Sequence, residues 1–108
     1  MGTAAYGIRA MAEDDIGQAH ALSQAVRWPH RPEDWRLLRA AGHAIVATDA
    51  AGAVVGTGLW WPYGSNVGSL GLVIVAPDRQ GAGIGRRLMD AILAAAGERT
   101  MLLNATVA

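Results

Sequence analysis

The sequence contains no cysteine and no lysine. The absence of cysteine excludes disulfide bonds, thiolate metal sites and a cysteine nucleophile. Three scattered histidines form no ligand cluster, so we expect no metal site. All nine basic residues are arginine, and nine acidic residues balance them to a net charge of zero. Because a polyanionic partner requires a basic excess, we expect no nucleic-acid partner.

Long apolar runs are also missing. None reaches the roughly 18 residues that span a membrane, and the N-terminus has no signal-peptide pattern. We therefore expect a cytoplasmic protein with no membrane partner. The length of 108 residues suits a single domain over residues 1–108. No repeat, low-complexity tract or interdomain linker interrupts it, and residues 1–5 are expected to be a flexible lead-in.

Hydropathy periodicity predicts an α/β (α+β) domain with the element order β-α-α-β-β-β-α-β. The order implies an antiparallel meander followed by one parallel βαβ crossover. Asp14 and Asp15 are expected to cap the first helix, and Pro62 to Asn66 to form a turn. The expected strands are 6–10, 44–48, 53–61, 67–75 and 101–107, and the expected helices are 16–26, 32–41 and 84–96.

The stretch Val73 to Leu88, VIVAPDRQGAGIGRRL, carries the most chemical information. A buried strand leads into a loop with glycines at 81, 83 and 85, and a helix follows at once. Glycines allow backbone N–H groups to converge on one point, and the helix start adds unpaired N–H groups and a positive dipole end. The pattern predicts a cradle for phosphate or pyrophosphate, with three arginines beside it. The alternative is a tight strand-to-helix connection in which the glycines serve packing.

Two other phosphate-binding folds fit the sequence less well. A Walker loop requires Lys followed by Ser or Thr after its last glycine, whereas Arg86 and Arg87 stand there. A dinucleotide-binding Rossmann unit has its glycine loop after the first strand, whereas this loop follows a three-strand meander. An unrelated phosphate-binding α/β domain is left as a further alternative.

Gln80, Gly83 and Gly85 have the spacing of the acetyl-CoA motif of the GNAT N-acetyltransferases, and this segment resembles that family. The strand ending Val75-Ala76-Pro77 and the element order are similar as well. The resemblance implies an acyl-CoA N-acyltransferase fold with a mixed central sheet, and acetyl-CoA or CoA as cofactor. Relatives continue with another helix and two more strands. We therefore expect a domain that is incomplete at its C-terminus, either as a fragment of a longer bacterial acetyltransferase or completed by a partner.

The resemblance also implies a set of cofactor-binding residues. One group would hold the pantetheine arm and acetyl group along the strand, and the other would hold the pyrophosphate in the loop. The implied chemistry is direct attack of an amine on the thioester carbonyl, which a backbone N–H polarises. The first group is Val73, Ile74 and Val75; the second is Gln80, Gly81, Ala82, Gly83, Ile84, Gly85 and Arg86.

The acceptor pocket has three aromatic candidates. Trp60 and Trp61 are adjacent in an expected strand, so their side chains face opposite sides. One of them is expected in the core. The other, together with Tyr63, would line the pocket, unless it serves packing alone.

The catalytic acid and base remain unassigned. His30 and His43 flank the second helix, which borders the acceptor site in the family the segment resembles, so either is a candidate base. Asn104 is a candidate contact to the cofactor arm, or else a plain polar residue at a strand end. No carboxylate lies on the strand 67–75.

The sequence as a whole predicts an N-acetyltransferase acting on a primary amine of a small molecule or peptide. The alternative is a non-catalytic CoA-binding or regulatory module. Because the last expected strand is apolar and without charge, a homodimer through that strand is also expected.

Overall fold

The computed structural model describes residues 6–26, 32–64 and 66–103. Its five strands form one sheet in the order β1-β2-β3-β4-β5. Neighbouring strands are antiparallel from β1 to β4, and β5 is parallel to β4. The expected α/β class, element order and crossover are confirmed. The strands are β1 Gly7–Ala10, β2 His43–Thr48, β3 Val54–Tyr63, β4 Val67–Val75 and β5 Thr100–Leu103; the helices are α1 Ile16–Ala25, α2 Pro32–Ala41 and α3 Ile84–Ala96; short 3-10 turns are η2 Glu13–Asp15 and η3 Pro77–Arg79.

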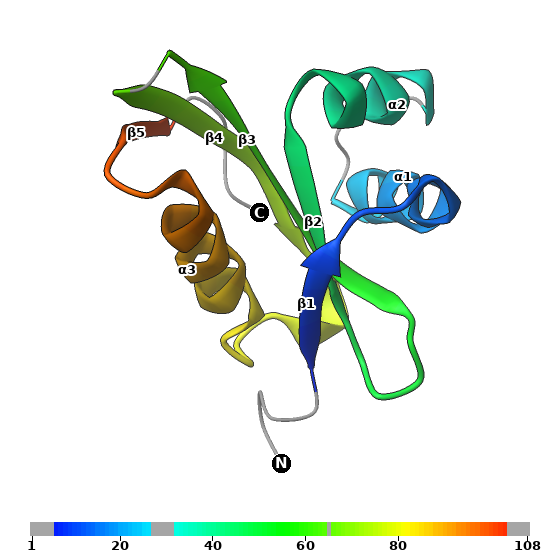
Figure 1. Cartoon of the computed structure of the whole chain (residues 1–108). Coiled ribbons are helices and arrows are strands. Elements are labelled where there is room, and N and C mark those ends of the chain that lie inside the picture. The colour runs from blue at the N-terminus through cyan, green and yellow to red at the C-terminus, as the bar shows by residue number, and fades with distance from the viewer. Residues whose placement is uncertain (1–5, 27–31, 65, 104–108) are drawn as a thin grey trace.

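The helices cover the sheet from both sides (Figure 1). Helix α3 packs on one face, called here the first face, and α1 and α2 pack on the opposite, second face. Glycines in β3 allow the close approach of α3, because a Cβ at Gly58 would lie 2.9 Å from Ile92 Cδ1 and one at Gly56 would lie 3.0 Å from Leu88 Cδ1. Residues 56, 58 and 60 of β3 therefore face α3, and the residues between them face α1 and α2.

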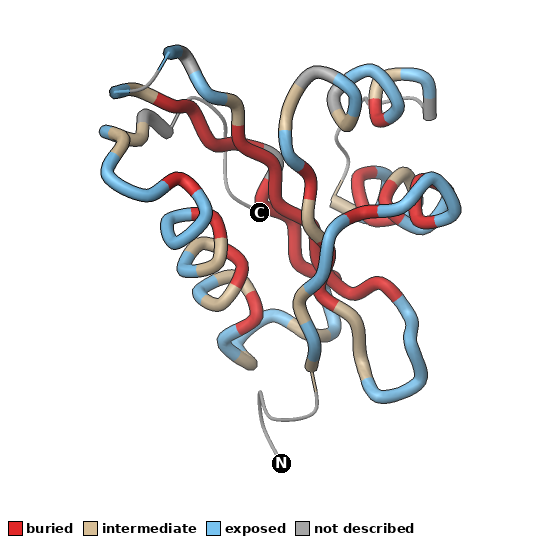
Figure 2. Tube along the Cα trace, viewed as in Figure 1, coloured by how far each residue is buried: buried red, intermediate tan, exposed pale blue. Residues whose placement is uncertain are grey.

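The core follows the middle of the sheet and the inner stripe of α3 (Figure 2). Buried residues of α3 recur every four positions, which is the spacing of one helical face. They are Ile84, Leu88, Ile92 and Ala96. Strands β3 and β4 are buried along most of their length, as expected for a central pair.

Two sequence expectations are corrected. Strand β3 continues to Tyr63, so Pro62 lies in a strand instead of opening a turn. Strand β2 pairs with β3 only as far as Trp60, so Pro62 lies beyond β2, where one side of β3 is an edge and tolerates proline. Asp15 precedes α1 but its side chain does not cap that helix; its carboxylate accepts hydrogen bonds from Arg9 and the Ala12 N–H.

Candidate functional site

The glycine loop lies between the end of β4 and the start of α3. Gly81 and Gly83 have φ values of +91° and +82°, which L side chains rarely adopt. Gly83 is the N-cap of α3, and no side chain caps this end. The first-turn N–H groups of α3 are therefore left without a capping side chain, next to a loop that is largely exposed. This geometry fits an anionic group at the loop.

Gln80 anchors the loop to the strand before it. Its Nε2 donates a hydrogen bond of 3.2 Å to the carbonyl oxygen of Val75, the last residue of β4. The motif glutamine thus holds the shape of the loop.

The three arginines near the loop differ in what they contact. Arg79 donates to Tyr6 Oη at 3.2 Å and to Asp49 at 3.3 Å, and the hydrogen bond to Tyr6 is the main cause that raises the pKa of Arg79. Arg87 donates to the Tyr6 carbonyl at 2.8 Å. Arg86 is 84% exposed and lies 3.6 Å from Asp90. Arg79 and Arg87 therefore both bind Tyr6, the residue before β1, and Arg86 extends into solvent.

In the described chain, β5 pairs with the first part of β4. The described register runs from Val67 opposite Thr100 to Leu70 opposite Leu103. Within the described chain, Val73 to Val75 have no partner on the β5 side. We call this β5-side edge of β4, from Gly71 to Val75, the slot; the last described row of β4–β5 pairing, Leu70 with Leu103, lies just before it.

A β-bulge interrupts β4 just beyond this last described row, between Gly71 and Ile74. Thr57 pairs with Ile74 and Leu59 pairs with Gly71, so two residues of β4 lie opposite Gly58. Bulges redirect backbone groups and occur frequently beside active sites. This bulge was not predicted from the sequence, although an isolated glycine within a strand pattern, such as Gly71 beside it in β4, is a signal for one.

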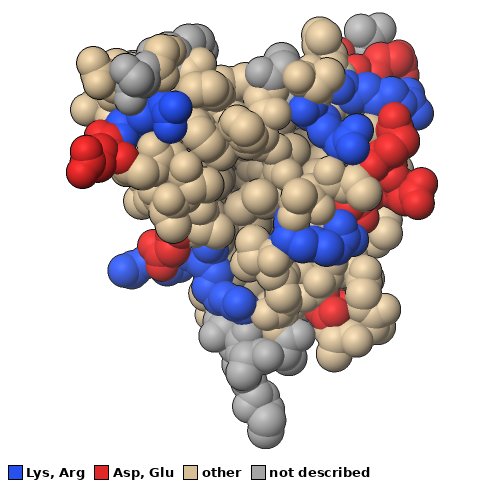
Figure 3. Space-filling model, in the orientation of Figure 1, with Lys and Arg blue, Asp and Glu red and all other residues tan. Residues whose placement is uncertain are grey.

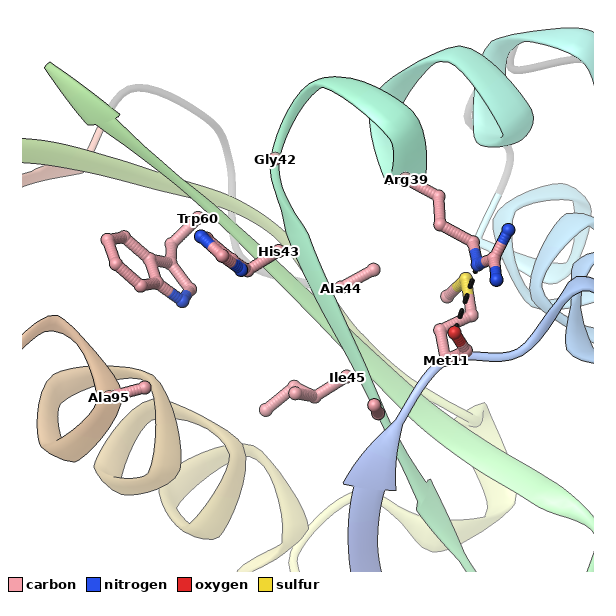
Figure 4. Close-up of a pocket in the computed structure, with 9 residues that line it drawn as sticks. Met11, Arg39, Gly42, His43, Ala44, Ile45, Trp60 and Ala95 are labelled. Atoms are coloured by element: carbon pink, nitrogen blue, oxygen red, sulfur yellow. Dashed lines mark hydrogen bonds between the residues drawn. The ribbon is translucent and has the colours of Figure 1, made fainter.

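An open cavity of about 610 Å³ lies at the other end of α3 (Figure 4). It is lined by Ala10, Met11, Arg39, Gly42, His43, Ala44, Ile45, Trp60 and Ala95. The His43 ring stacks on Trp60 with centroids 4.7 Å apart, and the Arg99 Cζ lies 5.4 Å from the Trp60 ring. The cavity borders the C-terminal part of α3 and the edge of β2, away from the glycine loop at the N-terminus of α3.

The residues expected around the acceptor thus do not all lie on the same face of the sheet. Trp60 is 5% exposed and faces α3, whereas Trp61 faces the other side, where a Cβ on Gly42 would lie 2.5 Å from its ring. His43 lies with Trp60 in the cavity and is not brought to the loop. The roles proposed for these residues stay predictions. His30 and Asn104 lie outside the described residues, as does the side chain of Tyr63.

Sequence reasoning did not single out Ser69, the only polar side chain on β4. It is 1% exposed, and its Oγ has no hydrogen-bond partner. A hydroxyl in an otherwise apolar strand was the available signal.

On the face shown in Figure 3, most residues are uncharged, and the few basic and acidic side chains lie interspersed. Among the described residues no group of three potential metal ligands occurs. No helix in this part of the chain is long and apolar enough to cross a membrane. The expected homodimer stays a prediction; in the described chain β5 pairs with β4 alone.

Comparison with known proteins agrees with the family that the glycine loop and the fold indicate. The model of the acetyltransferase (GNAT) family matches residues 9–108. The chain belongs to the GNAT acetyltransferase family. The resemblance noted in the motif is therefore confirmed over nearly the whole chain. A search of curated proteins gives no significant match.

Solved GNAT structures share the fold. The glucosamine N-acetyltransferase region of a fungal multi-domain β-N-acetylglucosaminidase is 26% identical, with a TM-score of 0.81; the match covers 94% of this chain and 14% of that one. The ribosomal-protein-alanine N-acetyltransferase of Brucella melitensis is 27% identical, with a TM-score of 0.73; the match covers 94% of this chain and 81% of that one. A GNAT acetyltransferase of Brucella melitensis solved with acetyl-CoA is 24% identical, with a TM-score of 0.73; the match covers 91% of this chain and 74% of that one. This chain thus spans a small part of the fungal protein and most of the other two.

Proposed function

We propose that this chain binds acetyl-CoA and transfers its acetyl group to a primary amine. The observation that carries the proposal is one continuous arrangement: the slot beside β4 leads to the left-handed glycine loop and the uncapped start of α3. The donors fit the cofactor, because exposed main-chain N–H groups suit a pyrophosphate and strand groups with no partner on the β5 side in the described chain suit an amide-bearing arm. Family membership and a relative solved with bound acetyl-CoA support the same assignment.

Each part of the site has a distinct task in this proposal. The main chain of Gly81 to Arg86 would hold the pyrophosphate, and the backbone of Val73 to Val75 would hold the pantetheine arm. When bound, acetyl-CoA supplies an acetyl group activated as a thioester. The chain's contribution is to bind and orient the two substrates, which is a large source of rate enhancement in such reactions. The bulge in β4 offers a redirected backbone N–H as the group that polarises the carbonyl.

The acceptor class is an amine of a small molecule or a protein N-terminus. Two relatives support this choice, since one is a glucosamine N-acetyltransferase region and the other a ribosomal-protein-alanine N-acetyltransferase. The amine must lose a proton during transfer. A candidate base among the described residues, His43, lies in the cavity on the α3 side, and His30 lies outside the described residues.

Binding is tested by calorimetric titration with CoA and dephospho-CoA. Gly83→Asp introduces a negative charge where the loop would hold the pyrophosphate, and we expect its affinity for CoA to fall at least tenfold. Gly64→Asp is the matched control: Gly64 also has a positive φ, of +76°, with nothing within 4 Å of an added Cβ, but lies at the opposite end of β4. Equal affinity of the wild type and Gly83→Asp would contradict the assignment.

A second candidate is a CoA-binding module without turnover. It is favoured by one observation: in the described chain, no carboxylate, His, Tyr or Cys lies on β4 or β5. The two candidates are separated by an acetyl-transfer assay with glucosamine and an alanine-initiated peptide. Release of CoA thiol that depends on the added amine supports the enzyme, and tight CoA binding without release supports the module.

A further inference from the structure

Arg79 lies at the point where the chain leaves β4 and enters the glycine loop. It is the last residue of η3. Its N–H donates to the Ala76 carbonyl at 2.8 Å, and its carbonyl accepts a hydrogen bond from the Ala82 N–H at 3.4 Å. The backbone of Arg79 thus takes part in the hydrogen bonds that shape the loop. Contacts that fix the Arg79 side chain therefore also restrict the loop.

The Arg79 guanidinium joins two segments that are distant in sequence. Nη1 donates to Tyr6 Oη at 3.2 Å, next to β1, and Nη2 donates to Asp49 Oδ2 at 3.3 Å, just after β2. Arg79 Cζ also lies 5.9 Å from the centre of the Tyr6 ring. The start of β1, the end of β2 and the glycine loop lie at the same end of the sheet (Figure 1). A guanidinium suits these contacts, because its rigid fork of donors serves two partners at once.

Asp49 is itself held in place. Its Oδ1 accepts hydrogen bonds of 3.0 Å from the Ala51 and Ala53 N–H groups, so the turn between β2 and β3 fixes the carboxylate and leaves Oδ2 for Arg79. The Asp49 side chain is 16% exposed, so this ion pair is partly shielded from water. Asp78 is a second acidic neighbour of Arg79, but its side chain is 82% exposed and lies 3.8 Å away. That is the geometry of a weak surface pair.

Restraint from outside the glycines matters for an anion site made of main-chain N–H groups. Such groups bind well only when they already point at the ligand, and a loop that must become ordered on binding loses affinity. Gly81 and Gly83 are conformationally permissive residues, so they do not fix the loop themselves. Gln80 and Arg79, the two residues before Gly81, restrain it through contacts to other parts of the fold.

We propose that Arg79 is a positioning residue of the CoA site, which holds the glycine loop, through Asp49 and Tyr6, in the shape that receives the pyrophosphate. The proposal rests on the proposed function and adds to it a residue outside the main-chain cradle on which the affinity for the cofactor depends. Both terminal nitrogens of Arg79 have partners within the chain. Arg79 therefore acts through the backbone of the loop and not as a charge placed on the cofactor.

The deciding variant is Asp49→Asn. Asparagine keeps an oxygen for the Ala51 and Ala53 N–H groups, so the turn is preserved, but Arg79 loses its carboxylate. If charge alone matters, removing a negative charge near an anion site raises the affinity, whereas loss of the Arg79 contact lowers it. Calorimetry on the full chain should show an affinity for CoA about tenfold below that of the wild type, roughly the cost of ordering one further backbone residue on binding. Asp78→Asn is the matched control: it removes the same charge beside Arg79 and should leave the affinity equal or slightly higher.

Arg79→Lys and the kinetics of transfer provide a second measurement. Lysine keeps the charge but lacks the fork that holds Tyr6 and Asp49 together, so its affinity for CoA should fall as that of Asp49→Asn does. With glucosamine or an alanine-initiated peptide as acceptor, both variants should raise the KM for acetyl-CoA about tenfold and keep the wild-type kcat at saturating acetyl-CoA. General damage to the fold would not give this split.

The outcomes separate this role from the proposed function. If the wild type binds CoA and either Asp49→Asn or Arg79→Lys binds it equally well or better, the role of Arg79 is overturned and the proposed function stands. Equal losses for Asp49→Asn and Asp78→Asn also overturn the role, because the exposed carboxylate does not hold the loop. A wild type that binds CoA but acetylates neither probe contradicts the transferase function alone, and the calorimetry of the variants still decides the role of Arg79. A wild type that does not bind CoA contradicts the proposed function and this role together.

Discussion

Asp15 connects the N-terminal strand to the first helical segment. Its two carboxylate oxygens accept hydrogen bonds from Arg9 at 2.7 and 2.9 Å, and one also accepts from the Ala12 N–H at 2.7 Å. The hydrogen bond from Arg9 is the main reason that the pKa of Asp15 lies below its usual range, against the opposing effect of burial. A charged carboxylate with such partners stabilises the fold only while it is ionised.

Replacing this carboxylate should therefore make stability less dependent on pH. At neutral pH, Asp15→Asn should lower the free energy of unfolding by about 1–3 kcal/mol, because Arg9 loses its charged partner. The native pKa is depressed, so the stabilisation is complete above the unfolded pKa of about 3.9 and is lost as the pH falls towards the native pKa. Urea unfolding at several pH values should show the wild type and variant converging below about pH 4. Asp14→Asn, at an exposed neighbour, should change little, and a pH-independent difference for Asp15→Asn would refute the explanation.

Some residues of interest could be recognised from the sequence, and others could not. Gln80, Gly83 and Gly85 were recognised because their proposed role depends on local backbone geometry, which residue type and spacing encode. Ser69 was not recognised, because its burial and lack of a partner depend on β3 and β5, which are distant in sequence. His43 was placed correctly near α2, but its stacking on Trp60 depends on the pairing of β2 with β3.

Among the elements, α3 joins the loop to the core. Its buried side chains lie against glycines of β3, and a Cβ on Gly85 would lie 3.5 Å from the Val75 side chain. The opposite side of the helix is exposed and includes Leu93 at 45% exposure. The position of the loop at the helix start therefore depends on the inner face of α3 and very little on the outer one.

Two leucines of α3 allow this dependence to be measured. Leu88 is 0% exposed, and Leu88→Ala should lower the free energy of unfolding by about 2–5 kcal/mol through lost burial and a cavity. Leu93→Ala makes the same chemical change on the outer face and should cost less than about 1 kcal/mol. Chemical denaturation of both variants gives the comparison. Similar losses for the two would mean that α3 does not pack on the sheet as described.

For the molecule as a whole, the order of elements was predictable from local patterns, whereas the slot was expected only from the family resemblance. Strand and helix patterns are local, and the expected order is confirmed, with Pro62 and the Asp15 cap as the errors. The described pairing of β4 with β5 runs to Leu70 and Leu103, the last residue of β5 that the structure describes. An opening beside Val73 to Val75 is what the family resemblance implies, and it stays a prediction.

Ligand binding across the slot should stabilise the whole molecule. The proposed CoA site draws on β4, the glycine loop and the start of α3, so binding requires the folded chain and shifts the unfolding equilibrium by mass action. At a CoA concentration of about 100 times Kd, the gain is about 2.7 kcal/mol, which in a domain of this size raises the melting temperature by roughly 10 °C or more. Thermal unfolding with CoA, with adenosine 3′,5′-bisphosphate and with pantetheine should rank CoA first, because each fragment reaches only one part of the site. An unchanged melting temperature with saturating CoA, or a full shift from pantetheine alone, would show that the glycine loop and the slot do not act as one binding site.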